Sequence, residues 1–160
     1  YLEEHIEQKR EIYERYREGL TGLPVDMNPF DSNHSIPNYW LSAMLIRREA
    51  MASQVQGEQE VLWKTEQGKS TPGEILEAMS TFGAEGRPIW KPMHMQPIYR
   101  MNPFITRDGN GRVGTNAYKE CGRADVGADI FNRGLCLPSD NKTTAEQQDR
   151  VIEIIKRCFE

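Results

Sequence analysis

Residues 87–97 read Arg-Pro-Ile-Trp-Lys-Pro-Met-His-Met-Gln-Pro, which places an arginine, a tryptophan, a lysine and a histidine around three prolines. Proline fixes its own backbone angle, lacks an N–H donor and pushes the preceding residue toward extended geometry. We therefore expect Arg87 to Gln96 to be extended chain without helix, holding four side chains suited to ligand contact. A proline-rich connector with surface charges would show the same local pattern.

Amphipathic helices are predicted at both ends of the chain. Near the N-terminus, apolar residues recur at helical spacing with charged residues between them, and these apolar residues are Leu2, Ile6, Tyr13, Tyr16 and Leu20. The charged residues form either a solvated helix face or the surface of a partner helix. Near the C-terminus, Thr143 to Glu146 is a capping box. It opens a helix whose apolar residues are Val151, Ile154, Ile155, Cys158 and Phe159.

Two shorter helices are predicted in the interior of the chain. Thr71 to Glu74 is a capping box with proline at the first helical position, and Gly83 ends this helix. Its apolar face consists of Ile75, Leu76, Met79 and Phe82. Residues 124–132 form a second short helix that Gly134 ends, and its inward-pointing residues are Val126, Ile130 and Phe131.

The remaining segments predict strands and turns. Asn38 to Ile46 is a continuous apolar and aromatic run of strand length, and Leu135 to Leu137 is a short buried strand. Asp26 to Pro37 is expected to be loop, and Asp108 to Arg112 a tight hairpin turn. The pattern assigns no element to Val61–Trp63. The order of elements predicts an α+β fold, with a small and mainly antiparallel sheet covered by helices on one side.

Composition excludes several classes of partner. The chain has 160 residues and a net charge of −4, so it lacks the overall basic charge that nucleic acid or an anionic membrane would attract. No apolar run approaches a membrane span and no secretory leader is present, so we expect a cytoplasmic protein. The chain begins with Tyr1, and we expect it to be a piece of a longer protein. Its 3 cysteines have neither metal-binding nor dithiol spacing, and Cys136 is expected to be a small buried residue.

Common catalytic motifs are absent from the sequence. It contains no phosphate loop, no dinucleotide-binding fingerprint and no nucleophile elbow. His5 lies in the charged first helix and His34 in a polar loop, and neither has a partner at metal-ligand spacing. We therefore expect no metal site within this chain, and these motifs supply no complete reaction centre.

Four side chains of the proline-rich stretch remain as candidates for ligand binding: His94, Trp90, Lys91 and Arg87. Arginine and lysine suit phosphate or carboxylate, tryptophan offers a flat face for a sugar or base, and histidine donates or accepts hydrogen bonds. Together they suit an anionic ligand that contains a ring, although Lys91 could equally be a solvated side chain.

Six segments of the chain carry a resemblance to a known family. They are residues 2–6, 13–16, 38–41, 87–97, 131–139 and 144–152. Trp-Lys-Pro-Met-His at 90–94 and Gly-Leu-Cys-Leu-Pro-Ser at 134–139 are the most specific strings. In this order the segments resemble the C-terminal part of the sugar aminotransferases of the DegT/StrS type, and the first helix resembles the helix that links the two domains of those enzymes.

The resemblance implies a fold-type I enzyme dependent on pyridoxal phosphate (PLP). Such an enzyme would be a homodimer that moves an amino group from glutamate to the keto group of a nucleotide-linked sugar, in bacterial surface polysaccharide or glycoconjugate synthesis. Residues 1–22 would be a remnant of the linking helix and 23–160 the small C-terminal domain. His94, Trp90, Lys91 and Arg87 would line the substrate side of the cleft and orient the sugar and its phosphates. Asn38 and Trp40 are further candidates, for which burial tendencies favour a strand-start cap and a core aromatic instead.

The resemblance also implies that the cofactor is held by residues outside this sequence. In the family, the lysine that forms the Schiff base lies in the large N-terminal domain, which is absent here. None of the lysines of the chain is at the matching position: Lys9, Lys64, Lys69, Lys91, Lys119, Lys142 and Lys156. We therefore expect the isolated fragment to be inactive. Residues Gln54 to Lys69 do not fit the family pattern.

Two other functions are compatible with the sequence. The first is a stand-alone, non-enzymatic domain of the same fold that binds a nucleotide sugar or regulates a partner. The second is a thiol or metal hydrolase, which is disfavoured because the cysteines and histidines lack partners in sequence.

Overall fold

The computed structural model describes residues 1–28, 30–57, 60–99, 102–103 and 125–160. These residues form two compact units, one made of Tyr1–Pro88 with Arg133–Glu160 and the other of Ile89–Asn132. The hairpin turn predicted at Asp108 to Arg112 lies outside the described residues. None of the described helices is long and apolar enough to cross a membrane.

The first unit contains a four-stranded sheet in the order β1 (Val25–Met27), β2 (Ser42–Ile46), β6 (Gly134–Leu137) and β5 (Arg87–Pro88). Every neighbouring pair in this sheet is antiparallel. Cys136 in β6 lies opposite Ala43 on one side and Arg87 on the other. The predicted α+β class with an antiparallel sheet is therefore confirmed.

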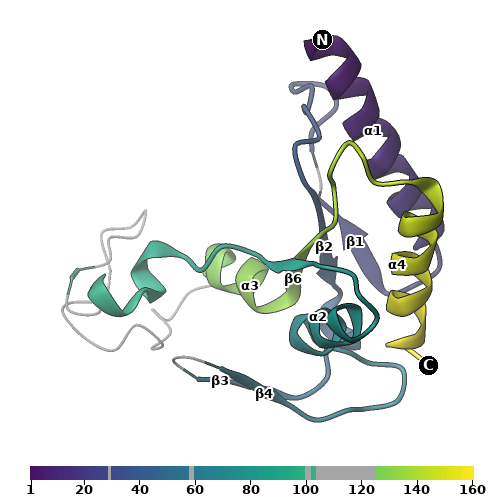
Figure 1. The fold of residues 1–160 in the computed structure, drawn as a ribbon. Coiled ribbons are helices and arrows are strands. Elements are labelled where there is room, and N and C mark those ends of the chain that lie inside the picture. Colours follow the sequence, from purple (N-terminus) through teal and green to yellow (C-terminus); the bar gives the residue numbers. More distant parts are fainter. Residues whose placement is uncertain (29, 58–59, 100–101, 104–124) are drawn as a thin grey trace. The chain divides into compact units, whose positions relative to one another are not determined.

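Two helices contact this sheet, α1 (Leu2–Gly19) and α2 (Pro72–Thr81), and a third helix, α4 (Ala145–Arg157), packs against both of them. Alternate residues of β2 are buried, as expected for a strand with one covered face. Figure 1 shows α1 and α4 lying side by side. The core is built from residues of the three helices and of β1, β2 and β6, among them Tyr16, Met44, Ile46, Ile75, Met79, Leu135, Leu137, Val151 and Ile155.

The predicted N-cap residue is confirmed at α2, whereas at α4 the cap lies one residue later than predicted. At α2, the Thr71 hydroxyl accepts a hydrogen bond from the Glu74 N–H at 3.1 Å, as predicted. The Glu74 carboxylate does not complete the predicted capping box, because it accepts hydrogen bonds from the hydroxyls of Ser70 and Thr65 at 2.8 and 3.1 Å. At α4, the capping box is formed by Thr144 and Gln147, one residue later than predicted. The reason is that the N–H of Thr143 donates to the carbonyl of Asp140 at 2.9 Å, within the preceding turn.

Burial on the helices differs from the predicted apolar faces at several positions. On α1, burial begins at Ile12 and continues to Tyr13 and Tyr16, whereas Leu2 is exposed. Phe82, just beyond the end of α2, is also exposed. A helix buries its apolar stripe only where another element covers it, and sequence periodicity does not show how far that cover extends.

The strand boundaries correct two predictions. The run from Asn38 to Ile46 is a strand only from Ser42, because the side chain of Asn38 accepts a hydrogen bond from the N–H of Trp40 at 3.1 Å in a turn. Trp40 is 65% exposed, so the expectation of a core aromatic is wrong. The loop predicted from Asp26 begins later than expected, because Val25–Met27 pairs with β2.

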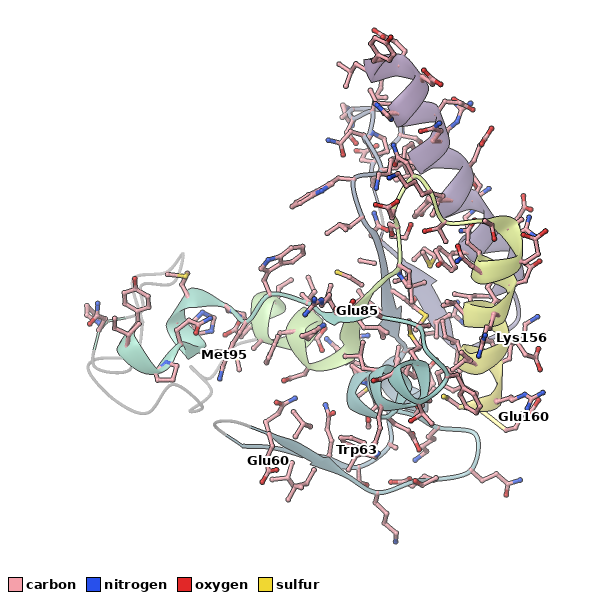
Figure 2. The ribbon with its side chains drawn as sticks, in the orientation of Figure 1. Glu60, Trp63, Glu85, Met95, Lys156 and Glu160 are labelled. Carbon is pink, nitrogen blue, oxygen red and sulfur yellow. The ribbon has the colours of Figure 1, made fainter. Side chains whose placement is uncertain are left out.

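A second, two-stranded sheet fills the region that the sequence pattern left unassigned. It consists of β3 (Gln54–Gln56) and β4 (Val61–Trp63), which are antiparallel. The Trp63 side chain extends toward the start of α2 (Figure 2), where its ring lies so close to Gly73 that a Cβ there would be 2.8 Å away. The hairpin is thereby attached to the first unit.

Candidate functional site

The proline-rich stretch is not extended throughout, which corrects the prediction. β5 covers Arg87–Pro88, and a 3-10 turn forms at Met93–Met95, with Met95 labelled in Figure 2. Pro92 precedes this turn with φ −54°, an angle compatible with the start of a helical turn. Its carbonyl accepts a hydrogen bond from the N–H of Met95 at 2.9 Å. Proline therefore starts the turn that carries the histidine.

The turn is held by side-chain contacts within the second unit. The Gln96 amide donates to the carbonyl of Lys91 at 3.1 Å, across the turn. Met95 is buried. Pro92 lies against Gly127 in the first turn of α3 (Val126–Arg133), where a Cβ would meet the proline ring at 3.4 Å. The local conformation of residues 91–96 is therefore fixed by its own hydrogen bonds and by α3.

His94 is paired with a carboxylate that the sequence analysis did not single out. Its Nε2 lies 2.5 Å from Oδ2 of Asp125, which is 31 residues away in sequence. The two side chains are only 16% and 25% exposed. The other carboxylate oxygen of Asp125 accepts a hydrogen bond from the N–H of Ala128 at 3.0 Å. Asp125 therefore caps α3 and holds His94 at the same time.

The signal for Asp125 in the sequence was its position before a helix. Aspartate is among the preferred residues at a helix N-terminus, because its carboxylate accepts an N–H of the first turn. The contact with His94 depends on tertiary packing and has no local signature. The same helix corrects another prediction, since Val126 is exposed and does not point inward.

The other three candidates differ in their surroundings. Trp90 is 62% exposed and Lys91 is partly buried, and both belong to the segment that carries His94. Arg87 lies in β5 of the first unit, where its exposed guanidinium pairs with the carboxylate of Glu85. The structure thus joins His94 to Asp125 and keeps Trp90 and Lys91 on the same segment.

The thiols of the described cysteines are unsuited to nucleophilic chemistry. Cys136 is buried in β6, as predicted, and burial raises the pKa of its thiol. Burial, with a contribution from the Glu74 carboxylate, raises the pKa of Cys158 to about 11. The thiolate is the reactive form, and a raised pKa disfavours it. Within the part of the chain that the structure describes, no group of three or more His, Cys, Asp and Glu side chains is arranged to hold a metal ion.

The cofactor implied by the family resemblance requires a lysine amine and a partner for the ring nitrogen. Two open cavities of the first unit, of about 370 Å³ and 260 Å³, flank the start of α4, and no lysine lines either of them. The amine of Lys9 donates to the carbonyl of Ser139, and that of Lys69 pairs with Glu66 at 3.2 Å. These cavities do not fit pyridoxal phosphate.

Comparison with known proteins identifies relatives across the chain. The model of the DegT/DnrJ/EryC1/StrS aminotransferase family matches residues 1–156. EpsN from Bacillus subtilis, described as a pyridoxal phosphate-dependent aminotransferase, is 28% identical over 158 residues, covering 99% of this chain and 32% of EpsN.

Solved structures show the same fold. Spr1654 from Streptococcus pneumoniae, described as a sugar aminotransferase, has a TM-score of 0.66 and 15% identity, over 97% of this chain and 31% of its own. DesI, solved in the presence of its TDP-sugar product, has a TM-score of 0.65 and 17% identity over the same shares. The chain thus spans about a third of the length of these relatives and has the α+β fold of the matching portion. It belongs to the DegT/DnrJ/EryC1/StrS aminotransferase family, whose members use pyridoxal phosphate.

Proposed function

We propose that this chain is the C-terminal portion of a nucleotide-sugar aminotransferase. The whole enzyme transfers an amino group from glutamate to a keto sugar, with PLP as cofactor, in bacterial surface polysaccharide or glycoconjugate synthesis in the cytoplasm. The observation that carries the proposal is the family match over residues 1–156. DesI, a relative in fold, was solved in the presence of its TDP-sugar product, which supports a nucleotide sugar as the substrate class.

The proposal includes a division of the enzyme into domains. Residues 1–22 belong to a helix that links two domains, and 23–160 form the smaller one. A larger N-terminal domain supplies the cofactor-binding lysine, and two copies of the whole protein form a dimer. When bound, PLP supplies the electron sink for amino transfer.

Within this chain, the proposed contacts with the substrate come from His94, Trp90, Lys91 and Arg87. The exposed ring of Trp90 offers a flat apolar face for a sugar or base. The cations of Lys91 and Arg87 suit the phosphates, and His94 suits a sugar hydroxyl. Such side chains accelerate a reaction by orienting the substrate, because correct positioning removes much of the entropic barrier.

The test is amino transfer by the full-length protein that carries this sequence. The assay supplies glutamate and a panel of uridine and thymidine diphosphate-linked keto sugars, and His94→Ala is compared with His34→Ala. Losing a hydrogen bond of about 1.5–3 kcal/mol to the substrate lowers kcat/KM for the sugar about 10- to 150-fold. His34 is a suitable control because it is exposed in a loop of the first unit. Unchanged kinetics in His94→Ala would remove it from the site, and a full-length protein that aminates none of these sugars would refute the proposed function.

A further inference from the structure

We infer that α1 is a rigid part of the first unit from Lys9 onward, so that the hinge between this chain and an upstream domain lies before Lys9. The alternative position for a hinge is Gly19–Pro24, the glycine-containing segment that leads from α1 to β1. The upstream domain belongs to the proposed function, on which this inference therefore rests. The consequence is that the helix assigned to the link between the domains moves together with the smaller domain.

The segment that follows β6 supplies the first set of contacts with α1. The Tyr16 hydroxyl donates a hydrogen bond to the carbonyl of Pro138 at 2.8 Å, and the amine of Lys9 donates to the carbonyl of Ser139. Ser139 is itself fixed, because its buried hydroxyl accepts a hydrogen bond from the N–H of Ser42 in β2 at 3.0 Å. Two positions of α1, about two helical turns apart, are therefore attached to the end of a central strand.

The helix α4 supplies the second set of contacts. The buried side chain of Gln148 donates a hydrogen bond to the carbonyl of Ile12 at 3.0 Å. Arg15 and Asp149 form two hydrogen bonds, at 3.0 and 2.6 Å. This ion pair is exposed and contributes little by itself. Separating α1 from α4, however, leaves the amide of Gln148 without the partner it has in the folded chain, which is costly for a buried polar group.

Together these contacts occur about once per helical turn along α1. Their positions on the helix are Lys9, Ile12, Tyr16 and Gly19. Their partners belong to residues 138–152, which pass beside α1 after β6 and return beside it as α4 (Figure 1). Bending α1 at any point within this stretch would therefore break several contacts at once.

The alternative hinge, Gly19–Pro24, is anchored on both sides of its turn. Leu20 and Val25 are both buried and belong to the hydrophobic core. The carbonyl at the end of the segment accepts a hydrogen bond from the N–H of Arg47 at 2.8 Å. Gly22 has a positive φ of 91°, a conformation that glycine adopts readily in a tight turn. The glycine therefore permits a turn that its buried neighbours hold in place.

The first two turns of α1 are held less firmly. Burial on this helix begins at Ile12, and Leu2 is exposed. The amide nitrogen of Asn141 lies 2.7 Å from Nδ1 of His5, but this contact is exposed to water. The rigid part of α1 therefore begins at the contact of Lys9.

The first experiment measures amide hydrogen exchange in the full-length protein, with and without Ile75→Val. Ile75 is fully buried in α2, which packs against α4 and β6. Removing one methyl group there destabilises the first unit enough to raise the exchange of its slowest amides about 2- to 12-fold. If α1 opens only together with this unit, the amides of residues 12–20 should accelerate by the same factor as those of β6 and α4. Ile98→Val, the same change at an exposed residue of the second unit, is the matched control and should leave these rates unchanged.

Exchange of residues 12–20 that does not respond to Ile75→Val would show that α1 opens independently, and it would overturn the inference. Thermal unfolding identifies a variant that fails to fold. Ile46→Val, at a fully buried position of β2, then repeats the test.

Limited proteolysis locates the hinge directly. A glutamate-specific protease has sites along the whole of α1, at Glu3, Glu4, Glu7, Glu11, Glu14 and Glu18. In the native full-length protein we expect cleavage of α1 only at the sites before Lys9, because proteases cut chain that has opened locally. The later sites should be as resistant as Glu153 in α4. Cleavage at Glu18, next to Gly19–Pro24, with Glu153 intact would place the hinge in that segment and contradict the inference.

The failures of the two proposals are distinguishable, because neither measurement depends on amino transfer. A full-length protein that aminates none of the tested sugars would refute the proposed function and leave the result for α1 unchanged. An α1 that opens independently would overturn its rigid attachment and leave the proposed function intact.

Discussion

Tyr16, in the last turn of α1, is fully buried, and its hydroxyl donates a hydrogen bond to the carbonyl of Pro138 at 2.8 Å. Pro138 follows β6 directly, so this hydrogen bond ties the first helix to the end of a central strand. Burial is the main cause that raises the pKa of the Tyr16 phenol well above its usual range. The phenol therefore stays protonated in the folded chain at a pH where it ionises in the unfolded chain.

Tyr16→Phe should lower the free energy of unfolding by about 1–2 kcal/mol at pH 8, because the carbonyl of Pro138 loses its partner. The stability that the phenol contributes is fully present below its unfolded pKa of about 10, and it is lost as pH rises through the folded pKa. Between pH 9 and 11 the free energy of unfolding should therefore fall more in the parent chain than in Tyr16→Phe. Urea unfolding of both proteins across this range measures the difference. A difference in the free energy of unfolding between the two proteins that stays constant with pH would contradict the prediction.

The sequence predicted the burial of some single residues correctly and of others wrongly. Cys136 was predicted to be buried because it lies in a short apolar segment between Gly134 and Pro138, and this local signal was sufficient. Trp40 was predicted wrongly. The preceding residue, Tyr39, has a positive φ of 52°, and its ring packs on Tyr13 with centroids 5.1 Å apart. A left-handed tyrosine has no sequence signature, since this conformation is held by tertiary packing.

At the level of elements, the close approach of α1 and α4 depends on the last residue of α1. A Cβ at Gly19 would overlap Cδ1 of Ile152 and lie 3.1 Å from its Cγ1. Ile152 is itself buried in α4. Glycine at this position therefore lets the two helices approach more closely than any other residue would.

Gly19→Ala should destabilise the chain by about 1 kcal/mol or more, because overpacking outweighs the small gain in helix propensity. Ile152→Val removes Cδ1, the atom that the new methyl group would meet. In that background Gly19→Ala should be close to neutral. Chemical denaturation of the four proteins of this cycle gives the coupling energy. Equal costs of Gly19→Ala in both backgrounds would show that the contact with Ile152 does not limit the approach of the helices.

Elements were predicted where they were long and periodic. All the predicted helices are present, because caps such as Thr71 and an apolar stripe over several turns are strong local signals. The strands β3 and β4 were missed because each has 3 residues, too few for an alternating pattern. The 3-10 turn that carries His94 has no distinct signal in the sequence, because proline interrupts helices as well as starting helical turns.

For the chain as a whole, the family could be predicted from the sequence, but the contacts at the candidate site could not. Local strings around residues 90–94 and 134–139 predicted the family, and the family match over residues 1–156 confirms it. The pair His94–Asp125 was beyond prediction because 31 residues separate its members. Under the proposed function, the chain contributes substrate contacts and the chemistry of the cofactor comes from a different part of the enzyme.

The proposed assignment of cofactor binding to another domain predicts where PLP attaches in the full-length protein. Reducing the loaded protein with borohydride, followed by digestion and mass spectrometry, should identify one modified lysine that lies outside this sequence. The reason is that an attached cofactor needs an enclosed amine with a partner for its ring nitrogen. In this chain Lys9 and Lys69 are engaged with Ser139 and Glu66. Lys91→Ala, which removes a proposed phosphate contact, should leave the extent of labelling unchanged while weakening sugar binding. A modified lysine among those of this chain would refute the proposed division between the two domains.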